Sequence, residues 1–479
     1  MMHKIAERGV GALLTALVIL TALLFGGLAL LSRTAAAQST EWQQRLDSAI
    51  TAEMTRTLTP GVQVAVAHNG RIIYAKAYGV ADNETARPLT NASLLRIGSV
   101  TKMVTGAIAA ELAEQGKLDL RAPISRYVPE LEGRKVGSVT THQLLTHTAG
   151  WLDNAVPYGR MGEGALGEVM REVTDTLFIT EPGRVISYSN PGFSMAGYVI
   201  ERAGNARYGA QADRMILRPT GMPHATFRPL EAMVRDFSQG HMGQPGRPAT
   251  MVRPFTENTA QWAAGFLMAS ATDMARFAAM LMDGGTIDGA RVISEGAVRR
   301  MTTPDPAIPG DANARYAYGL MIAEIEGVRV WQHGGSINGF DANLTMFPDE
   351  KLAIVVIDNR SGPSVGNTTS LVYRGVTGRA LPTPPNPIGE ERMPTAAERR
   401  ALLGHYRFGP LRIEIAEQAD TLVFRQGGGS FGLRMTAPDR ARVMVPAMLP
   451  PVHLVIVPGT DGRAAYLHQS LRAVPRVEP

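Results

Sequence analysis

Hydrophobic and polar positions alternate in two neighbouring stretches near the start of the long central region. Residues 61–68 are Gly-Val-Gln-Val-Ala-Val-Ala-His, and residues 71–78 are Arg-Ile-Ile-Tyr-Ala-Lys-Ala-Tyr. Asn69 and Gly70 separate them, and this pair favours a two-residue hairpin turn. The pattern predicts a β-hairpin over residues 61–78.

Helix-like and strand-like patterns alternate from about residue 41 to residue 380. Residues 102–116 are rich in Ala, Leu, Ile and Glu and predict a helix. Residues 271–282 predict another, with Thr272-Asp273 as its cap and Gly284-Gly285 after its end. Strands are predicted at Val328–Gln332, Ala342–Phe347 and Leu352–Asp358. This order indicates an α/β domain over residues 41–380, whose sheet is built from both ends with helices between.

A proline-rich stretch follows this domain. Prolines 382, 384, 385, 387 and 394 predict a stiff linker over residues 381–397. Short alternating runs then recur with turn residues between them, which predicts a small β-barrel or sandwich over residues 398–472. The predicted strands are Leu411–Ile415, Leu422–Arg425, Arg442–Val445, His453–Val457 and Ala464–His468.

The first 37 residues have the pattern of an export leader. Lys4 and Arg8 precede a long apolar run, and Ala35-Ala-Ala-Gln38 matches an A-x-A cleavage site. We predict a signal peptide cleaved after Ala37, and a periplasmic or extracellular protein. The apolar run is long enough to span a bilayer, so an uncleaved membrane anchor is the alternative.

Composition narrows the class of function. The formal charge is +5, but the basic residues are scattered and form no reader motif, which argues against nucleic-acid binding. The chain has no cysteine, which excludes a cysteine nucleophile, disulfides and Cys-ligated metal sites. The oligomeric state cannot be inferred from these features.

Three segments carry candidate chemistry. Ser99-Val-Thr-Lys102 lies where a loop enters a helix, so the serine and the lysine share one helical face. Tyr188 and Asn190 lie two residues apart after a Pro-Gly turn, where both can face one cleft. His333-Gly334-Gly335-Ser336 follows the strand Val-Arg-Val-Trp-Gln, and its glycines let a substrate approach the backbone. Alone, each segment also fits a plain structural role.

Together and in this order, the segments resemble the three motifs of the class C β-lactamase and D-alanyl-D-alanine carboxypeptidase family. Residues 141–150 and 265–277 also resemble segments of that family, so the resemblance runs from about residue 42 to residue 380. Residues 398–472, which open near Leu403-Gly-His-Tyr-Arg-Phe, more loosely resemble the lipocalin-like domain appended to some members.

The resemblance implies a role for each motif residue. Ser99 would attack a carbonyl and form an acyl-enzyme, with Lys102 and an ionised Tyr188 sharing the general-base role. Asn190 would hold the substrate amide. The backbone N–H groups of Ser99 and Ser336 would form the oxyanion hole, with Gly334 and Gly335 beside the substrate. No metal or organic cofactor is implied.

The third motif departs from that of β-lactamases, which begins with lysine, because here it begins with His333. A neutral imidazole anchors a substrate carboxylate weakly. This argues for a D-amino peptidase or an esterase over an efficient β-lactamase. It also predicts that carboxylate-bearing substrates bind better near pH 6 than near pH 8.

Other residues offer competing hypotheses. Ser364 and Ser430 each lie in G-x-S-x-G, but the α/β-hydrolase fold needs more βαβ units and a later Asp and His than this layout provides. His142 and His147 lack a third clustered ligand, which argues against zinc, and they are expected to orient the loop before Trp151.

The function predicted is therefore an exported serine hydrolase acting on a peptide, lactam or ester. The alternative is a non-catalytic penicillin-recognising protein that captures a ligand without turnover.

Overall fold

The structure is a computed structural model. It describes residues 41–478 except 154–159, 244–245, 304, 363–366, 384–388, 419 and 447–450. The predicted leader and Ser364 lie outside the described residues, as does part of the predicted linker. Contacts divide the chain into two units, one of residues 1–53 and 365–381 and the other of residues 54–364 and 382–479.

In the first unit, the helical residues 41–53 lie with α12 (Thr368–Thr377). Gly375 of α12 lies directly against Trp42. A Cβ atom on Gly375 would come within 2.4 Å of the Trp42 Cβ, so this close contact requires glycine.

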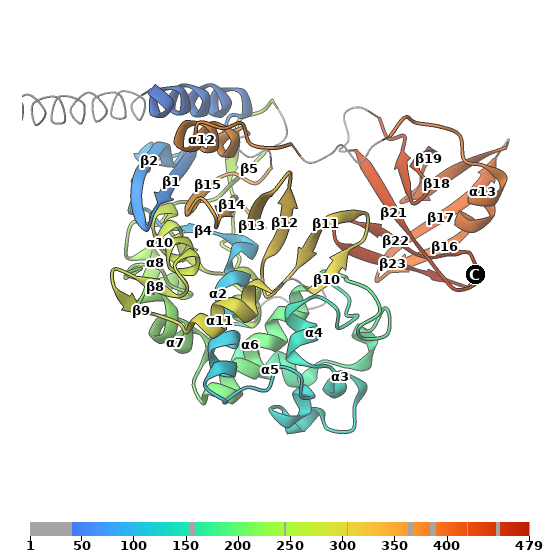
Figure 1. Ribbon diagram of the computed structural model, residues 1–479, viewed down its shortest axis with the longest axis horizontal. Helices are drawn as coiled ribbons and strands as arrows, with labels where there is room; N and C mark the ends of the chain where they lie inside the picture. Colours follow the sequence, from blue (N-terminus) through green and yellow to red (C-terminus); the bar gives the residue numbers. More distant parts are fainter. Residues whose placement is uncertain are drawn as a thin grey trace, which may run out of the picture. The chain divides into compact units, whose positions relative to one another are not determined.

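The second unit contains a large antiparallel sheet, shown in Figure 1. Strands β1 and β15 pair with each other inside this sheet, so the two ends of the predicted domain meet in one sheet as expected. The predicted hairpin is formed by β1 and β2, and Asn69 and Gly70 both have the positive φ that its turn needs. In sheet order the strands are β10 (Asp305–Ile308), β11 (Asp311–Tyr316), β12 (Met321–Ile325), β13 (Val328–Ile337), β14 (Phe340–Phe347), β15 (Leu352–Asp358), β1 (Gly61–His68), β2 (Arg71–Asp82) and β3 (Arg87–Pro88).

Helices cover the sheet and surround α2 (Thr101–Glu114). Helix α10 (Ala271–Met282) packs on β1 and β15, and its cap is Ser270, whose side chain forms a capping box with Asp273. The cap therefore lies two positions before Thr272, the first residue of the predicted Thr272-Asp273 pair. Helix α2 contacts α6, α9 and α11, so most of its residues are buried. The other main helices are α4 (Thr141–Leu145), α5 (Ala165–Glu172), α6 (Asn190–Gly204), α9 (Trp262–Gly265) and α11 (Glu295–Thr302).

The C-terminal strands close into an antiparallel barrel, which confirms the predicted all-β domain. Its core includes Tyr406, Leu433 and Leu467. A short helix, α13 (Ala396–Leu402), precedes it, and β23 continues beyond residue 472, where the predicted domain ended. The barrel strands are β16 (Gly404–Phe408), β17 (Leu411–Gln418), β18 (Thr421–Gln426), β19 (Gly429–Ala437), β20 (Arg440–Val443), β21 (Val452–Pro458), β22 (Ala464–Gln469) and β23 (Arg472–Val477).

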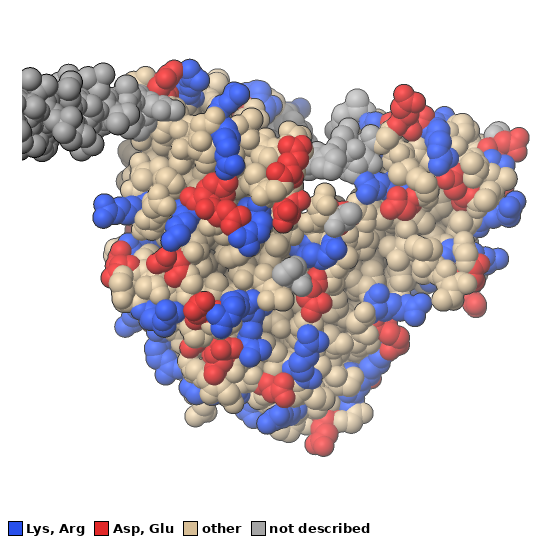
Figure 2. All heavy atoms as spheres, viewed as in Figure 1, with Lys and Arg blue, Asp and Glu red and all other residues tan. Residues whose placement is uncertain are grey.

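Acidic and basic side chains are interspersed on the face of the molecule in Figure 2. Within the described part of the chain, no helix is both long enough and apolar enough to cross a membrane.

Candidate active site

Ser99 lies in a short 3-10 turn, Gly98–Val100, that leads directly into α2. The turn is pressed against β13. Gly98 has a φ of 51°, and a Cβ atom there would lie 2.7 Å from the backbone nitrogen of Ser336. Glycine at position 98 therefore lets the turn that holds Ser99, which we call the serine turn, contact the third motif, residues 333–336, although the two are far apart in the sequence.

Lys102 follows Ser99 on the same face of the helix. Its Nζ lies 3.1 Å from the Ser99 Oγ, 2.7 Å from the Asn190 Oδ1 and 2.6 Å from the carbonyl oxygen of Ala264. Burial lowers the pKa of Lys102 to about 7, with Asp153 opposing and Arg472 reinforcing that change. Near neutral pH the amine is thus available without its proton, and it touches the serine hydroxyl.

Tyr188 approaches the same hydroxyl from the segment before α6. Its side chain forms a hydrogen bond with Ser99, and its ring centroid lies 4.8 Å from the Lys102 Nζ. Burial raises the pKa of Tyr188 above its ordinary value, and the Ser99 hydrogen bond only partly opposes this. The phenol is therefore neutral, in contrast to the ionised Tyr188 expected from the sequence.

Asn190 is the first residue of α6, and its side-chain amide links Lys102 to the carboxylate of Asp153. The Asn190 Oδ1 accepts from Lys102, while its backbone N and Nδ2 lie 2.8 and 3.0 Å from the Asp153 Oδ1. Asp153 was not identified in the sequence analysis. It lies two residues after Trp151 in an irregular segment, where no local pattern distinguishes it.

His333 takes part in a buried hydrogen-bonded chain. Its Nδ1 donates to the carbonyl oxygen of Gly334 (2.5 Å), so its Nε2 accepts from the Tyr316 hydroxyl (2.9 Å). The Tyr316 oxygen in turn accepts from the Nε2 of His147 (3.2 Å), and the backbone N–H of Ser189 donates to the His147 Nδ1 (3.1 Å). These directions satisfy both imidazoles in their neutral form.

The burial of these hydrogen-bonded residues rules out the role expected for His333, which was to anchor a substrate carboxylate. Desolvation, reinforced by the positive charge of Lys102, lowers the pKa of His333 to about 3. His333 therefore stays neutral throughout pH 6–8 and offers no cation to a carboxylate. The pH dependence expected from its titration has no basis in this structure.

Gly335 brings β13 against the serine turn, whereas Gly334 faces open space. A Cβ atom on Gly335 would lie 2.0 Å from the Ile97 carbonyl oxygen and 2.9 Å from the Ser99 nitrogen. On Gly334 the nearest atom would be 3.9 Å away. The backbone nitrogens of Ser99 and Ser336 thus border the same contact, which fits a pair of oxyanion donors.

A cavity of about 160 Å³ opens beside the serine. Ser99, Asn190 and Ser336 line it, so three of the residues predicted from the sequence share one small space. Arg96, Thr256 and Phe266 also line it, and the sequence analysis did not single them out.

The barrel supplies two further contacts to the site. The backbone N–H of Tyr188 donates to the Leu471 carbonyl oxygen (2.7 Å). Arg472 donates from Nε (2.9 Å) and from a terminal nitrogen (2.6 Å) to the Asp153 Oδ2. Asp153 therefore accepts hydrogen bonds from Arg472 at one carboxylate oxygen and from Asn190 at the other. These residues lie in distant segments, and no sequence motif indicates that they pair.

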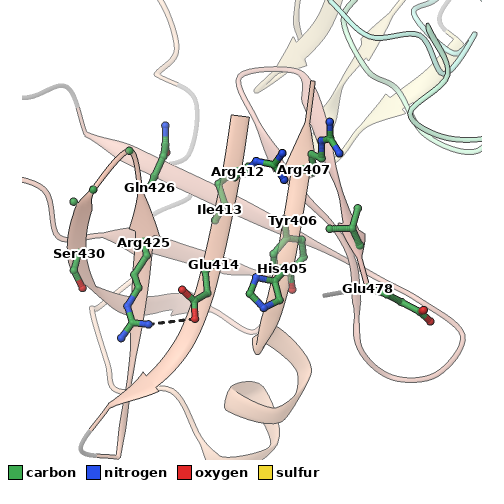
Figure 3. Close-up of a pocket in the computed structure, with 14 residues that line it drawn as sticks. His405, Tyr406, Arg407, Arg412, Ile413, Glu414, Arg425, Gln426, Ser430 and Glu478 are labelled. Carbon is green, nitrogen blue, oxygen red and sulfur yellow. Dashed lines mark hydrogen bonds and ion pairs between the residues drawn. The ribbon is translucent and has the colours of Figure 1, made fainter. Parts of the chain in front are cut away.

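Of the competing candidates, His147 belongs to the buried hydrogen-bonded chain beside Tyr188, whereas His142 and Ser430 lie elsewhere. His142 contacts the Tyr318 hydroxyl (2.8 Å) and Asp305 (2.9 Å). Among the described residues, no group of three His, Cys, Asp or Glu is placed to hold a metal ion. Ser430 lies on β19, in a barrel hollow of about 630 Å³ where Arg425 pairs with Glu414 (Figure 3), and none of the predicted catalytic residues lines it.

The family described as Beta-lactamase matches residues 46–377. Similar proteins include the esterase EstB of Burkholderia gladioli, which is 33% identical over 42% of this chain and 55% of its own length. A beta-lactamase of Providencia stuartii is 27% identical, over 66% of this chain and 87% of that protein. A D-aminopeptidase of Gluconobacter oxydans (strain 621H) is 26% identical, over 75% and 66% respectively.

Solved structures share the fold as well. SurE matches with a TM-score of 0.76 and 24% identity, covering 91% of this chain and all of that one. The D-alanine carboxypeptidase AmpC from Burkholderia cenocepacia matches with a TM-score of 0.58 and 21% identity, covering 71% of this chain and 99% of that one.

Proposed function

Because this chain belongs to the Beta-lactamase family, we propose that it is an exported serine hydrolase that acts through an acyl-enzyme on Ser99. One observation carries the proposal. The Ser99 hydroxyl is contacted at once by a buried lysine amine, 3.1 Å away, and by the Tyr188 phenol. A nucleophile with an adjacent base and a second proton-handling group is the arrangement that covalent acyl transfer needs.

The proposed first step is attack on a carbonyl carbon. The neutral Lys102 amine takes the Ser99 proton while Oγ bonds to the carbonyl, and the N–H groups of Ser99 and Ser336 receive the oxyanion. The neutral Tyr188 phenol then passes a proton to the leaving group and recovers it from Lys102. Asn190 keeps the lysine directed at the serine.

Water completes the proposed cycle. It takes the place of the leaving group and gives a proton to Lys102 as its oxygen bonds to the acyl carbon. The bond between that carbon and the Ser99 Oγ then breaks, Oγ regains the proton from Lys102, and the acid leaves. The substrate class is a peptide or an ester, for which the names of the esterase and the D-aminopeptidase give support. A lactam is less favoured, because His333 is neutral where β-lactamases carry lysine. Export rests on the predicted leader.

Labelling with a fluorescent penicillin and a fluorophosphonate tests this function. We expect Ser99→Ala to abolish labelling by any probe that marks the wild type, whereas Ser364→Ala and Ser430→Ala, the matched controls, leave it unchanged. Fluorophosphonate labelling that survives in Ser99→Ala would refute the nucleophile. A product burst without a steady phase would instead favour a capturing protein over an enzyme.

A further inference from the structure

Arg96 is the one charged side chain among the described residues that line the cavity beside Ser99. It lies in the short strand β4 (Leu95–Arg96), three residues before the proposed nucleophile. Because the cavity is small, a group that touches Arg96 and a carbonyl at Ser99 can belong to one substrate.

The Arg96 guanidinium is buried with little to balance its charge. Its residue is 2% exposed, it packs over the rings of Phe255 (4.1 Å) and Phe266 (5.1 Å), and it donates to the carbonyl oxygen of Thr256. Its Nε is buried without a hydrogen-bond partner, and no ion pair to Arg96 is found among the described residues, where Glu257 acts on it only through its charge. Burial lowers the pKa of Arg96 to about 10, opposed by the charge of Glu257, so it remains a cation at neutral pH.

A buried cation without an anion is costly, and an anionic ligand removes that cost. The other two candidates for binding an anionic ligand, Lys102 and His333, are occupied or uncharged. Lys102 directs its nitrogen at Ser99, Asn190 and Ala264, and His333 is neutral. Planar guanidinium groups also match the two oxygens of a carboxylate.

We propose that Arg96 binds a carboxylate of the substrate in the cavity beside Ser99. This inference rests on the proposed function and adds the substrate class, a peptide or ester that carries an acid near its scissile bond. The competing explanation is structural, because Arg96 also joins β4 to the segment that contains Thr256.

Paired esters that differ only in charge distinguish the two roles. With the carboxylate on the acyl side, the pair is 4-nitrophenyl hydrogen adipate and its methyl ester. With the carboxylate on the leaving group, the pair is 3-butanoyloxybenzoate and its methyl ester. We expect Arg96→Gln to raise KM for the charged ester of one pair about 10- to 100-fold, as the loss of a charge-assisted hydrogen bond does. KM for the neutral partner is expected to change little, and Arg96→Lys to retain part of the preference.

Arg360→Gln is the matched control, because Arg360 is equally buried but is not among the residues lining the cavity. It should affect charged and neutral esters alike. Equal losses on both esters in Arg96→Gln, or no loss on either, would overturn the proposal.

A second measurement needs no variant to fold. Hippurate should protect wild-type Ser99 from a neutral fluorophosphonate at lower concentration than hippuramide does. Equal protection, or none from hippurate, counts against the carboxylate site. Absence of any labelling at Ser99 would refute the proposed function itself, which keeps the two failures distinct.

Discussion

Lys102 is completely buried at the start of α2, and its environment decides its chemistry. An exposed lysine carries a proton far above neutral pH and is no base there. Desolvation lowers the pKa of Lys102 to about 7, so protonated and neutral forms coexist near neutrality. The neutral form predominates as pH rises above that value. The residues around this one side chain thus convert an ordinary cation into a candidate general base.

We therefore expect kcat/KM for a neutral ester to rise between pH 5 and pH 8 with one apparent pKa near 7, and then to level off. Lys102→Arg, which keeps the charge but cannot release its proton, should lower kcat/KM about 10²- to 10⁴-fold. The measurement is a pH–rate profile. The exposed Lys117→Arg serves as control, and near-normal activity in Lys102→Arg would disprove the general-base role.

At the scale of elements, β13 and the serine turn pack directly against each other and so position each other. The sequence analysis placed His333-Gly-Gly-Ser after the end of a strand, but β13 continues to Ile337 and includes all four residues. Side chains alternate along a strand, so Gly335 faces the turn and Gly334 faces away from it. This alternation explains why only Gly335 has no room for a Cβ atom.

Gly335→Ala is expected to force β13 away from Ser99 and so to misplace the Ser336 N–H. The fall in kcat should be about 10²- to 10³-fold, as for the loss of an oxyanion donor. Gly334→Ala should cost far less, because its nearest neighbour lies 3.9 Å from the added carbon. Steady-state kinetics with thermal melts would measure both. Equal losses in two folded variants would contradict this account of β13.

At the scale of the whole molecule, the barrel contributes to the site through the segment before α6. Besides Leu471 and Arg472, His468 of β22 donates from Nε2 to the Ile186 carbonyl oxygen (3.1 Å). The Tyr466 and Thr180 hydroxyls also form a hydrogen bond (2.5 Å). Arg472, Asp153 and Asn190 then form an unbroken chain of contacts to Lys102. The barrel is therefore coupled to the proposed base through charge as well as through packing.

Substitutions at the two charged residues should shift the pH–rate profile in opposite directions. Asp153 raises the pKa of Lys102 and Arg472 lowers it. We expect Asp153→Asn to move the apparent pKa of kcat/KM down and Arg472→Gln to move it up, while Arg472→Lys stays near wild type. Shifts of the same sign, or none in variants that melt normally, would show that the barrel contact is only structural.

Local patterns predicted most elements that have a clear turn sequence or a clear hydrophobic pattern within their own residues. The Asn69-Gly70 turn and its flanking alternation predicted β1 and β2, and the predicted bounds of β15 and α10 match exactly. The barrel strands β16, β19 and β23 were missed. Strand β19 contains two glycines and β23 a proline, which weaken a strand pattern, and pairing within a closed barrel overrides that weakness.

The sequence by itself determined the proposed nucleophile and its lysine, because a spacing of three residues on a helix places both on one face. It also determined that Tyr188 and Asn190 could face a common cleft. Only the tertiary structure decided that Tyr188 and His333 are neutral, that Arg96 lines the cavity, and that Asp153 pairs with Arg472. The physical reason is that protonation depends on burial, and ion pairs depend on contacts between segments far apart in the chain, neither of which a local pattern contains.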